Sequence, residues 1–244
     1  MTHRTIFDRQ LTELHQETCG LLRQIESGLL AALAALGRGE DVDLDALIEG
    51  DQQINEQAQR LRATALRLIA TQQPLACDLR ALSVILRLLP DVERMGDHVA
   101  SLAKIQRRLN RCADCLPLDE LPGDAAATIG LMGHTVAAML NGGISAFATR
   151  DAEMARRVAA MDYEADELYG QFFQDSLTVI RAMPVATNQA VHLLRLVHHL
   201  ERIGDLITNV AEQVVFLTSG MAINLNPKQA FGIEVGADSA RWHG

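Results

Sequence analysis

Apolar residues recur every three or four positions along most of the chain, which is the spacing of one face of an α-helix. In the last long segment this apolar seam comprises Leu193, Leu196, Leu200, Ile203, Ile207, Val210, Val214 and Leu217. A seam in the same register comprises Ile85, Leu88, Val92, Met95, Val99 and Leu102. This pattern predicts helices that pack as bundles, with each half of the chain burying its own core.

Residues that break helices divide the chain into long segments. They lie at 37–41, 72–74, 116–124, 150–151 and 183–184 and are rich in glycine, proline and aspartate. Such residues end helices because they lack a backbone donor, favour positive φ or compete for backbone hydrogen bonds. We therefore expect an all-α protein with six long helices, at 5–36, 43–72, 76–110, 124–149, 151–182 and 185–219.

The two halves of the chain repeat one another. A shift of 108 positions places RLLPDVERMGD (87–97) on RLVHHLERIGD (195–205). Duplication of a three-helix unit explains this match. We expect two tandem three-helix bundles, at 5–110 and 124–219, joined by a linker at 111–123. The tail, 220–244, has no counterpart in the repeat, and we expect it to be disordered or to form a subunit contact.

Composition excludes several classes of protein. The chain is 48% hydrophobic and only 4% aromatic, and its formal net charge is −9. This charge disfavours nucleic-acid binding, because a phosphate backbone would be repelled. The N-terminus lacks the charged flank and apolar core of a signal peptide, and no run reaches the ~18 apolar residues of a transmembrane helix. We expect a soluble, cytoplasmic protein without a transmembrane segment.

Four cysteines are too few for a disulfide scaffold in a chain of 244 residues. Cys19 and Cys77 are expected to be buried thiols. Cys112 and Cys115 form a CxxC in the linker, which could pair or bind a metal. No second CxxC follows, so the motif alone does not indicate a zinc site.

Pairs of acidic residues spaced four apart are the candidate chemistry. The ER-x-GD pattern places Glu93 with Asp97 in the first half and Glu201 with Asp205 in the second. Like charges at this spacing repel on a helix unless a cation reverses the sign. On a helical wheel both pairs face away from the apolar seam. A merely solvated acidic face is the alternative interpretation.

Further acidic residues are predicted to lie at the same height along the bundle, because they are about equally far in sequence from a predicted turn. Asp162 and Asp166 precede Pro184 by 22 and 18 residues, and Glu201 and Asp205 follow it by 17 and 21. Because helices rise ~1.5 Å per residue, these four carboxylates are expected to converge. Around Pro74 the first half places Asp51 and Asn55 opposite Glu93 and Asp97. Oxygen ligands without thiolates favour hard cations such as Mg²⁺, Mn²⁺ or iron, singly or as a multinuclear cluster.

Neighbouring residues modify this expectation. The amide of Asn55 and the helix-interior Pro90 predict that the first site is the weaker. His198 lies one turn before Glu201 and could be an accessory ligand. Gly96 and Gly204 each cost a helix interior about 1 kcal/mol relative to alanine, so close helix packing or access to a metal is needed to explain them.

These motifs together resemble those of the PhoU family of phosphate-signalling accessory proteins, over roughly residues 5–220. The residues that carry the resemblance are the duplicated three-helix frame, QQP followed by Asp78-Leu79-Arg80, ERMGDH at 93–98 and ERIGD at 201–205. The resemblance implies a cytoplasmic negative regulator of phosphate uptake and of the phosphate-starvation response. Its implied partners are the ATPase subunit of the phosphate ABC transporter and a phosphate sensor histidine kinase, reached by peripheral association with the membrane complex.

The same resemblance implies metal clusters on the bundle surface. Carried over residue by residue, the implied metal-binding residues are Asp51, Glu93, Asp97, Asp162, Asp166, Glu201, Asp205, Asn209 and Glu212. Asn55 departs from the family pattern at the second position of its motif. The second half lacks the Asp-Leu-Arg triplet, so a partner contact carried by Arg80 would be one-sided.

Two other functions remain open at this point. The chain could be a structural helical adaptor without bound metal, or a carboxylate-bridged di-metal enzyme. The enzyme class pairs Glu-x-x-His motifs on inward-facing positions, whereas this chain spaces its acids as ExxxD facing outward. We expect a regulator and not an enzyme. The Ala- and Leu-rich stretch at 31–36 would permit a homodimer.

Overall fold

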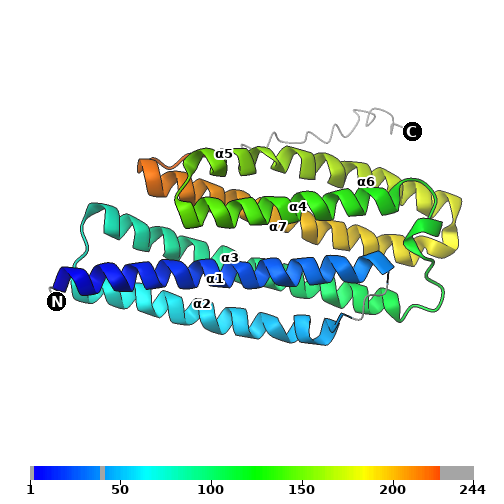
Figure 1. Ribbon diagram of the computed structural model, residues 1–244. Coiled ribbons are helices and arrows are strands. Elements are labelled where there is room, and N and C mark those ends of the chain that lie inside the picture. The colour runs from blue at the N-terminus through cyan, green and yellow to red at the C-terminus, as the bar shows by residue number, and fades with distance from the viewer. Residues whose placement is uncertain (1–2, 39–41, 226–244) are drawn as a thin grey trace, which may run out of the picture.

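The computed structural model describes residues 3–38 and 42–225, and this part of the chain is built from helices without strands. The first half contributes α1 (His3–Arg38), α2 (Leu44–Gln72) and α3 (Ala76–Asn110). The second half contributes α4 (Ala125–Thr149), α5 (Ala152–Ala160), α6 (Asp162–Ala182) and α7 (Thr187–Ser219), with short 3₁₀ helices η1 (Leu118–Glu120) and η2 (Pro184–Ala186). The all-α prediction of two three-helix bundles is confirmed (Figure 1).

The predicted fifth helix, 151–182, is divided in two. Asp151 begins α5 by accepting hydrogen bonds from the amides of Glu153 and Met154, both at 2.9 Å. The helix is interrupted at Met161, whose amide bonds to the carbonyl of Val158 in a tight final turn. The expectation of one continuous helix was therefore wrong, and α6 begins at Asp162. By contrast, α3 continues through Pro90.

The two bundles share one core. Figure 1 shows α1–α3 and α4–α7 lying side by side, and α3 packs along α7. All the predicted seam residues of α3 are buried, as are those of α7 except the partly buried Leu217. They belong to one contiguous cluster that extends through both halves. The expectation that each half buries its own core was wrong, because α3 and α7 are apolar on more than one face.

The Ala- and Leu-rich stretch at 31–36 is used inside the chain. Ala32 and Ala35 are buried. Leu33 lies against α4, where a Cβ added to Gly133 would come within 2.6 Å of its Cδ2 atom. The glycine therefore lets α1 and α4 approach closely. Part of the surface expected to permit a homodimer is therefore covered by α4 of the same chain.

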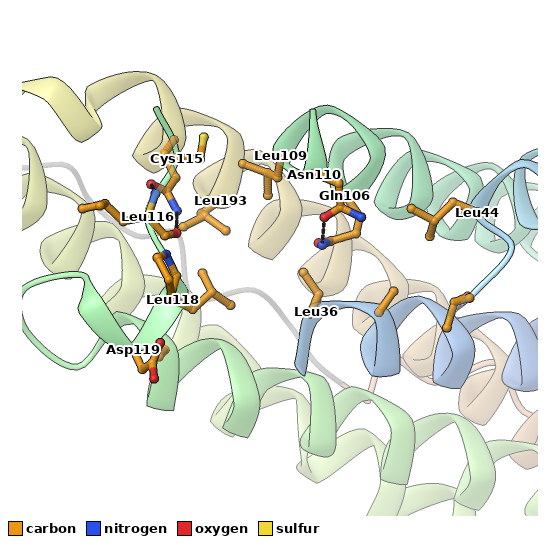
Figure 2. Close-up of a pocket in the computed structure, with 15 residues that line it drawn as sticks. Leu36, Leu44, Gln106, Leu109, Asn110, Cys115, Leu116, Leu118, Asp119 and Leu193 are labelled. Atoms are coloured by element: carbon orange, nitrogen blue, oxygen red, sulfur yellow. Dashed lines mark hydrogen bonds between the residues drawn. The ribbon is translucent and has the colours of Figure 1, made fainter. Parts of the chain in front are cut away.

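The linker is fastened to the start of α7. Gln189 is buried, its Nε2 donates to the carbonyl of Leu116 at 2.6 Å, and its Oε1 accepts from the amide of Leu116 at 2.9 Å. Cys112 and Cys115 are joined as a disulfide just before this anchor. Beside the anchor lies a pocket of about 670 Å³ whose lining includes Leu36, Leu44 and Leu193 (Figure 2).

Arg80 joins the halves at the opposite end. Its Nη1 donates to the carbonyl of Leu217 in the last turn of α7, at 3.5 Å. Gly220 has a φ of +75°, and a Cβ there would come within 2.9 Å of the guanidinium. A positive group at a helix C-terminus is favourable, because it offsets the helix dipole. Asp78 pairs with Arg4 at 2.9 Å, so both charged residues of the Asp-Leu-Arg triplet make contacts within the chain.

Two expectations about burial are only partly met. Cys19 is buried as predicted, but Cys77 is exposed, because it lies in the first turn of α3 beyond the apolar seam. By length and composition alone, α1 is long and apolar enough between Arg4 and Leu36 to cross a membrane. Of its most apolar 18-residue stretch 39% is buried inside the fold, where Leu22 and Ile25 join the shared core, whereas Leu30 is exposed. Residues 226–244, most of the predicted tail, lie outside the described residues.

Candidate metal centre

The first-half cluster consists of Asp51 and Asn55 on α2 with Glu93 and Asp97 on α3. Gly96 makes their approach possible, because a Cβ at this position would lie 3.0 Å from the Oδ1 of Asp51 and 3.3 Å from two carbons of Ile54. Of the two explanations for this glycine, close approach of the neighbouring helix is the observed one. The side chain that Gly96 admits is that of Asp51, which is also a candidate metal ligand. Close packing of α2 and access to a metal would therefore both require a glycine at this position.

Asp51 is under electrostatic strain within this cluster. Its Oδ1 is buried and has no hydrogen-bond partner, while its Oδ2 accepts a long bond from Asn55 at 3.4 Å. Burial, followed by the adjacent Asp97 carboxylate, raises the pKa of Asp51, and Lys104 and Asn55 oppose the change. Two acidic groups that face each other in this way require a proton or a cation between them.

The other two positions of the first-half cluster are more open. Glu93 is half-buried and accepts a bond from the Nη2 of Arg62 on α2 at 3.1 Å. Asp97 is exposed, as the helical wheel predicted. Arg62 was not singled out from the sequence, because nothing in the ER-x-GD pattern indicates which basic residue of another helix lies beside the glutamate.

The second-half cluster consists of Asp162 and Asp166 on α6 with Glu201 and Asp205 on α7. A Cβ on Gly204 would lie 3.3 Å from the Oδ1 of Asp162, which repeats the relation of Gly96 to Asp51. The predicted convergence of the two helices at this level is therefore confirmed for Asp162. Asp166 is half-buried one turn further along α6.

Two of these carboxylates are buried instead of facing outward. Asp162 is 2% exposed and Glu201 is 7% exposed. The outward prediction, which the helical wheel made for Glu201, was wrong because the wheel considered only one apolar seam. In the structure α7 contacts α3, α4, α5 and α6, so little of its circumference faces solvent.

Arg202 pairs with two carboxylates of the second-half cluster from within the same helix. Its Nε and Nη2 donate to the two carboxylate oxygens of Glu201 at 2.7 and 2.9 Å, and its Nη1 lies 3.0 Å from the Oδ2 of Asp205. Burial alone would lower the pKa of Arg202, but Glu201 and Asp205 outweigh it and raise the pKa. Such a bidentate pair is among the strongest interactions that a carboxylate makes with a side chain.

The predicted outer ligands lie beside a pocket of about 530 Å³ next to this cluster. Its wall includes Asn209 and Glu212 of α7, and also Arg94 and His98 of α3. Asn209 lies beside Asp91 of α3 and opposes the rise in the pKa of Asp91 that burial causes. Glu212 accepts the amide of Leu225 at 3.0 Å. The second-half site is thus partly walled by the first half, which the repeat pattern did not predict.

His98, His198 and His199 lie close to one another where α3 packs against α7. His198 lies 3.7 Å from Glu201, at the edge of the site. The Nδ1 atoms of His98 and His199 face each other at 3.0 Å across the α3–α7 contact. Burial, followed by the neighbouring His98 and His198, lowers the pKa of His199 to about 4. Of two rings joined in this way, one must donate and the other accept, so the accepting ring is neutral.

The chemical nature of the donor atoms suits a hard divalent cation. Carboxylate oxygens predominate, and the unpartnered Oδ1 of Asp51 is an available ligand atom. In arrangement the fit is incomplete. Among the described residues, no three His, Cys, Asp or Glu side chains already stand together as a set that could hold a metal ion. Binding would require side chains, Arg202 above all, to change position.

A family model described as the PhoU domain matches residues 20–106 and again residues 129–214. The chain is 31% identical over 224 residues to a phosphate-specific transport system accessory protein PhoU homolog of Clostridium acetobutylicum, covering 91% of this chain and 99% of that protein. It is also 31% identical over 225 residues to the homolog of Streptococcus pneumoniae serotype 4, covering 91% and 100%.

Solved structures give the same result. The crystal structure of PhoU from Pseudomonas aeruginosa matches with a TM-score of 0.80 and 26% identity, over 88% of this chain and all of that one. The regulatory protein PhoU from Streptococcus pneumoniae matches with a TM-score of 0.77 and 28% identity, over 89% and 99%. Each half of the duplicated fold therefore corresponds to one copy of the same domain.

Proposed function

The chain belongs to the PhoU family, and we propose that it is a metal-binding regulatory adaptor that represses phosphate uptake and phosphate-starvation signalling. Its relatives are named as accessory proteins of the phosphate-specific transport system. We propose as partners the ATPase subunit of that transporter and the sensor histidine kinase that reads its state. The protein would act in the cytoplasm, by peripheral association with the membrane complex, and without catalysing a reaction.

The observation that carries the metal component is the repeated contact between an aspartate and a helix-interior glycine. Asp51 meets Gly96, and Asp162 meets Gly204, each beside an ER-x-GD acidic pair. In each half, a glycine that costs helix stability lets an aspartate of the neighbouring helix approach the backbone. The acidic pair of the ER-x-GD motif lies next to that aspartate. This arrangement gains nothing from electrostatics until a positive group enters it.

A bound divalent cation would supply positive charge and Lewis acidity that hold carboxylates from two helices together. In the first half its ligands would come from Asp51, Glu93 and Asp97. In the second half they would come from Asp162, Asp166, Glu201 and Asp205, with Asn209 and Glu212 further out. The chain's own residues orient these oxygens through the two glycines and through the tight turn that begins α6 at Asp162.

A reporter of phosphate starvation tests the role and the site together. The gene is deleted, and a secreted phosphatase is measured in phosphate-rich medium after restoring wild type, Glu93→Ala/Asp97→Ala or Glu201→Ala/Asp205→Ala. The control is Asp8→Ala/Glu13→Ala, which removes two exposed carboxylates of α1. We expect deletion to switch the reporter on, wild type and control to silence it, and the cluster variants to leave it on although they fold. A reporter indifferent to deletion would refute the regulatory role.

The second candidate is a helical adaptor that needs no metal, and one observation favours it. Arg62 and Arg202 already pair with Glu93 and Glu201. In that case both clusters would be internal ion-pair networks, and regulation would depend on the folded surface alone. Metal analysis of purified protein separates the two candidates. Melting temperatures indifferent to Mn²⁺, Mg²⁺ and iron, with no bound metal, would support the adaptor and eliminate the metal component.

A further inference from the structure

We propose that Arg202 is an internal cation that occupies the second-half cluster, so that a divalent cation binds the first-half cluster before the second. This inference rests on the metal binding proposed above and assigns an order to its two sites. It makes Arg202 a residue that determines where the cation binds, through competition for the same oxygens.

The contacts of Arg202 occupy most of the carboxylate oxygens of Glu201 and Asp205 that a metal ion could bind. Its guanidinium engages both oxygens of Glu201 and one oxygen of Asp205, through three different nitrogens. Glu201 is almost fully buried, so these charge-assisted bonds are shielded from water. A cation ligated by Glu201 and Asp205 must therefore displace Arg202. The 530 Å³ pocket beside it, which Arg202 itself lines, gives the side chain a place to move.

The equivalent arginine of the first half does not do this. Arg94 occupies the repeat position of Arg202, 108 residues earlier. It is exposed, lies 3.6 Å from Asp91, and points into the wall of the pocket beside the second-half cluster. No salt bridge connects Arg94 with Glu93 or Asp97 in the described structure. The same motif arginine is therefore inside one cluster and outside the other.

In the first-half cluster, no salt bridge reaches Asp51 or Asp97 within the described residues. Asp51 and Asp97 face each other, and the Oδ1 of Asp51 is buried without a hydrogen-bond partner. Arg62 reaches only Glu93, through a single nitrogen. A divalent cation entering between Asp51 and Asp97 displaces no bidentate arginine. This order is the reverse of the one that Asn55 and Pro90 suggest from the sequence.

Mn²⁺ is a suitable probe, since it is hard enough for carboxylates and can be counted as free ion by electron paramagnetic resonance. We would titrate wild type, Asp51→Asn, Arg202→Gln and Arg94→Gln, with Arg202→Lys as a variant that keeps the charge. We expect wild type to show one tight class of site, which Asp51→Asn removes. Arg202→Gln should strengthen the second class at least tenfold, while Arg94→Gln and Arg202→Lys leave it as weak as in wild type.

The outcomes separate the order of binding from metal binding itself. Two equal classes in wild type, a tight class that survives Asp51→Asn, or an Arg202→Gln titration identical to wild type would each overturn the order while leaving metal binding intact. An absence of Mn²⁺ binding in wild type and in every variant would overturn both proposals. Circular dichroism of each variant ensures that a lost site reflects lost ligands and not lost folding.

Discussion

Asp51 in the first half and Asp162 in the second lie against equivalent glycines, but their charged surroundings differ. Asp51 faces the Asp97 carboxylate and has one oxygen without a hydrogen-bond partner. The second-half cluster instead contains Arg202, which binds Glu201 and Asp205. Duplication has therefore preserved the backbone approach of the helices, but the arginine of the ER-x-GD motif pairs with both acids of its own motif in only one copy. Similar geometry in two repeats does not imply similar electrostatics.

The largest expected effect comes from removing the internal cation of the second half. Arg202→Gln leaves Glu201 buried with its bidentate partner gone, whereas Arg94→Gln breaks only an exposed contact at 3.6 Å. Breaking a buried pair costs roughly 3–5 kcal/mol. Because Arg202 is 40% exposed, we expect solvent screening to reduce this to about 2 kcal/mol.

Urea unfolding without added metal measures this difference between the halves. Arg94→Gln should change the free energy of unfolding by less than about 0.5 kcal/mol, as is usual for surface pairs. Equal losses in the two variants would mean that the ER-x-GD arginines play the same role in both halves, and the contrast between the clusters would be lost.

Much of the fold was predictable because helix periodicity and breakers act locally. The seams of α3 and α7 were identified residue by residue, and Pro74 and Pro184 located the turns that set the height of the acidic residues. The break at Met161 was not predicted, since no glycine or proline marks it. The shared core was also missed, because a single seam per helix was assumed, whereas α7 buries residues against four other helices.

The site was predictable only in part, for a related reason. The spacing of Glu201 and Asp205 and the height of Asp162 follow from regular helix geometry. Which arginine reaches which carboxylate depends on side-chain direction and on contacts between helices. Arg62 and Arg94 show this, because the motif neighbour Arg94 turns away from Glu93 while Arg62 of another helix takes its place.

Acid should weaken the surface where the two halves meet. The pKa of His199 is lowered from 6.5 to about 4, chiefly by burial and then by His98 and His198, with Arg195 adding to the effect. Between pH 6.5 and 4, His199 is protonated in the unfolded chain but stays neutral in the folded chain. The free energy of unfolding therefore decreases as the pH falls through this window. Because the ring is only half-buried, we expect about 1 kcal/mol after solvent screening.

The measurement is the free energy of unfolding at pH 7 and pH 4.5 for wild type and His199→Phe. Phenylalanine keeps an aromatic ring but does not titrate. The variant should lose about 1 kcal/mol less than wild type over this interval. Identical pH dependence in the two proteins would show that the contact between the halves does not depend on a neutral His199.

Alanine substitutions test the two site glycines against a glycine in open space. Gly130 of α4 has no heavy atom within 4 Å of an added Cβ, so Gly130→Ala should gain about 0.5–1 kcal/mol from helix propensity. At Gly204 the Cβ would meet Asp162 at 3.3 Å, and at Gly96 it would meet Asp51 at 3.0 Å and Ile54 at 3.3 Å. We expect Gly204→Ala to be near neutral and Gly96→Ala to lose about 0.5 kcal/mol. A gain in all three urea midpoints would refute the close-approach explanation.

The smallest effect should differ in sign between the halves. The pKa of Asp51 is raised by burial and then by Asp97, so in the absence of metal its ionisation above pH 3.8 costs stability. Asp51→Asn should therefore stabilise the metal-free protein at pH 7 by a few tenths of a kcal/mol, the scale of repulsion between like charges on helices. Asp205→Asn should destabilise it, because the bond from Arg202 loses its charged acceptor.

Adding Mn²⁺ should reverse the result for Asp51→Asn, since wild type then binds the cation through a carboxylate that the variant has lost. A metal-free Asp51→Asn protein less stable than wild type would indicate that Asp51 is already neutralised, and the two clusters would then be electrostatically alike.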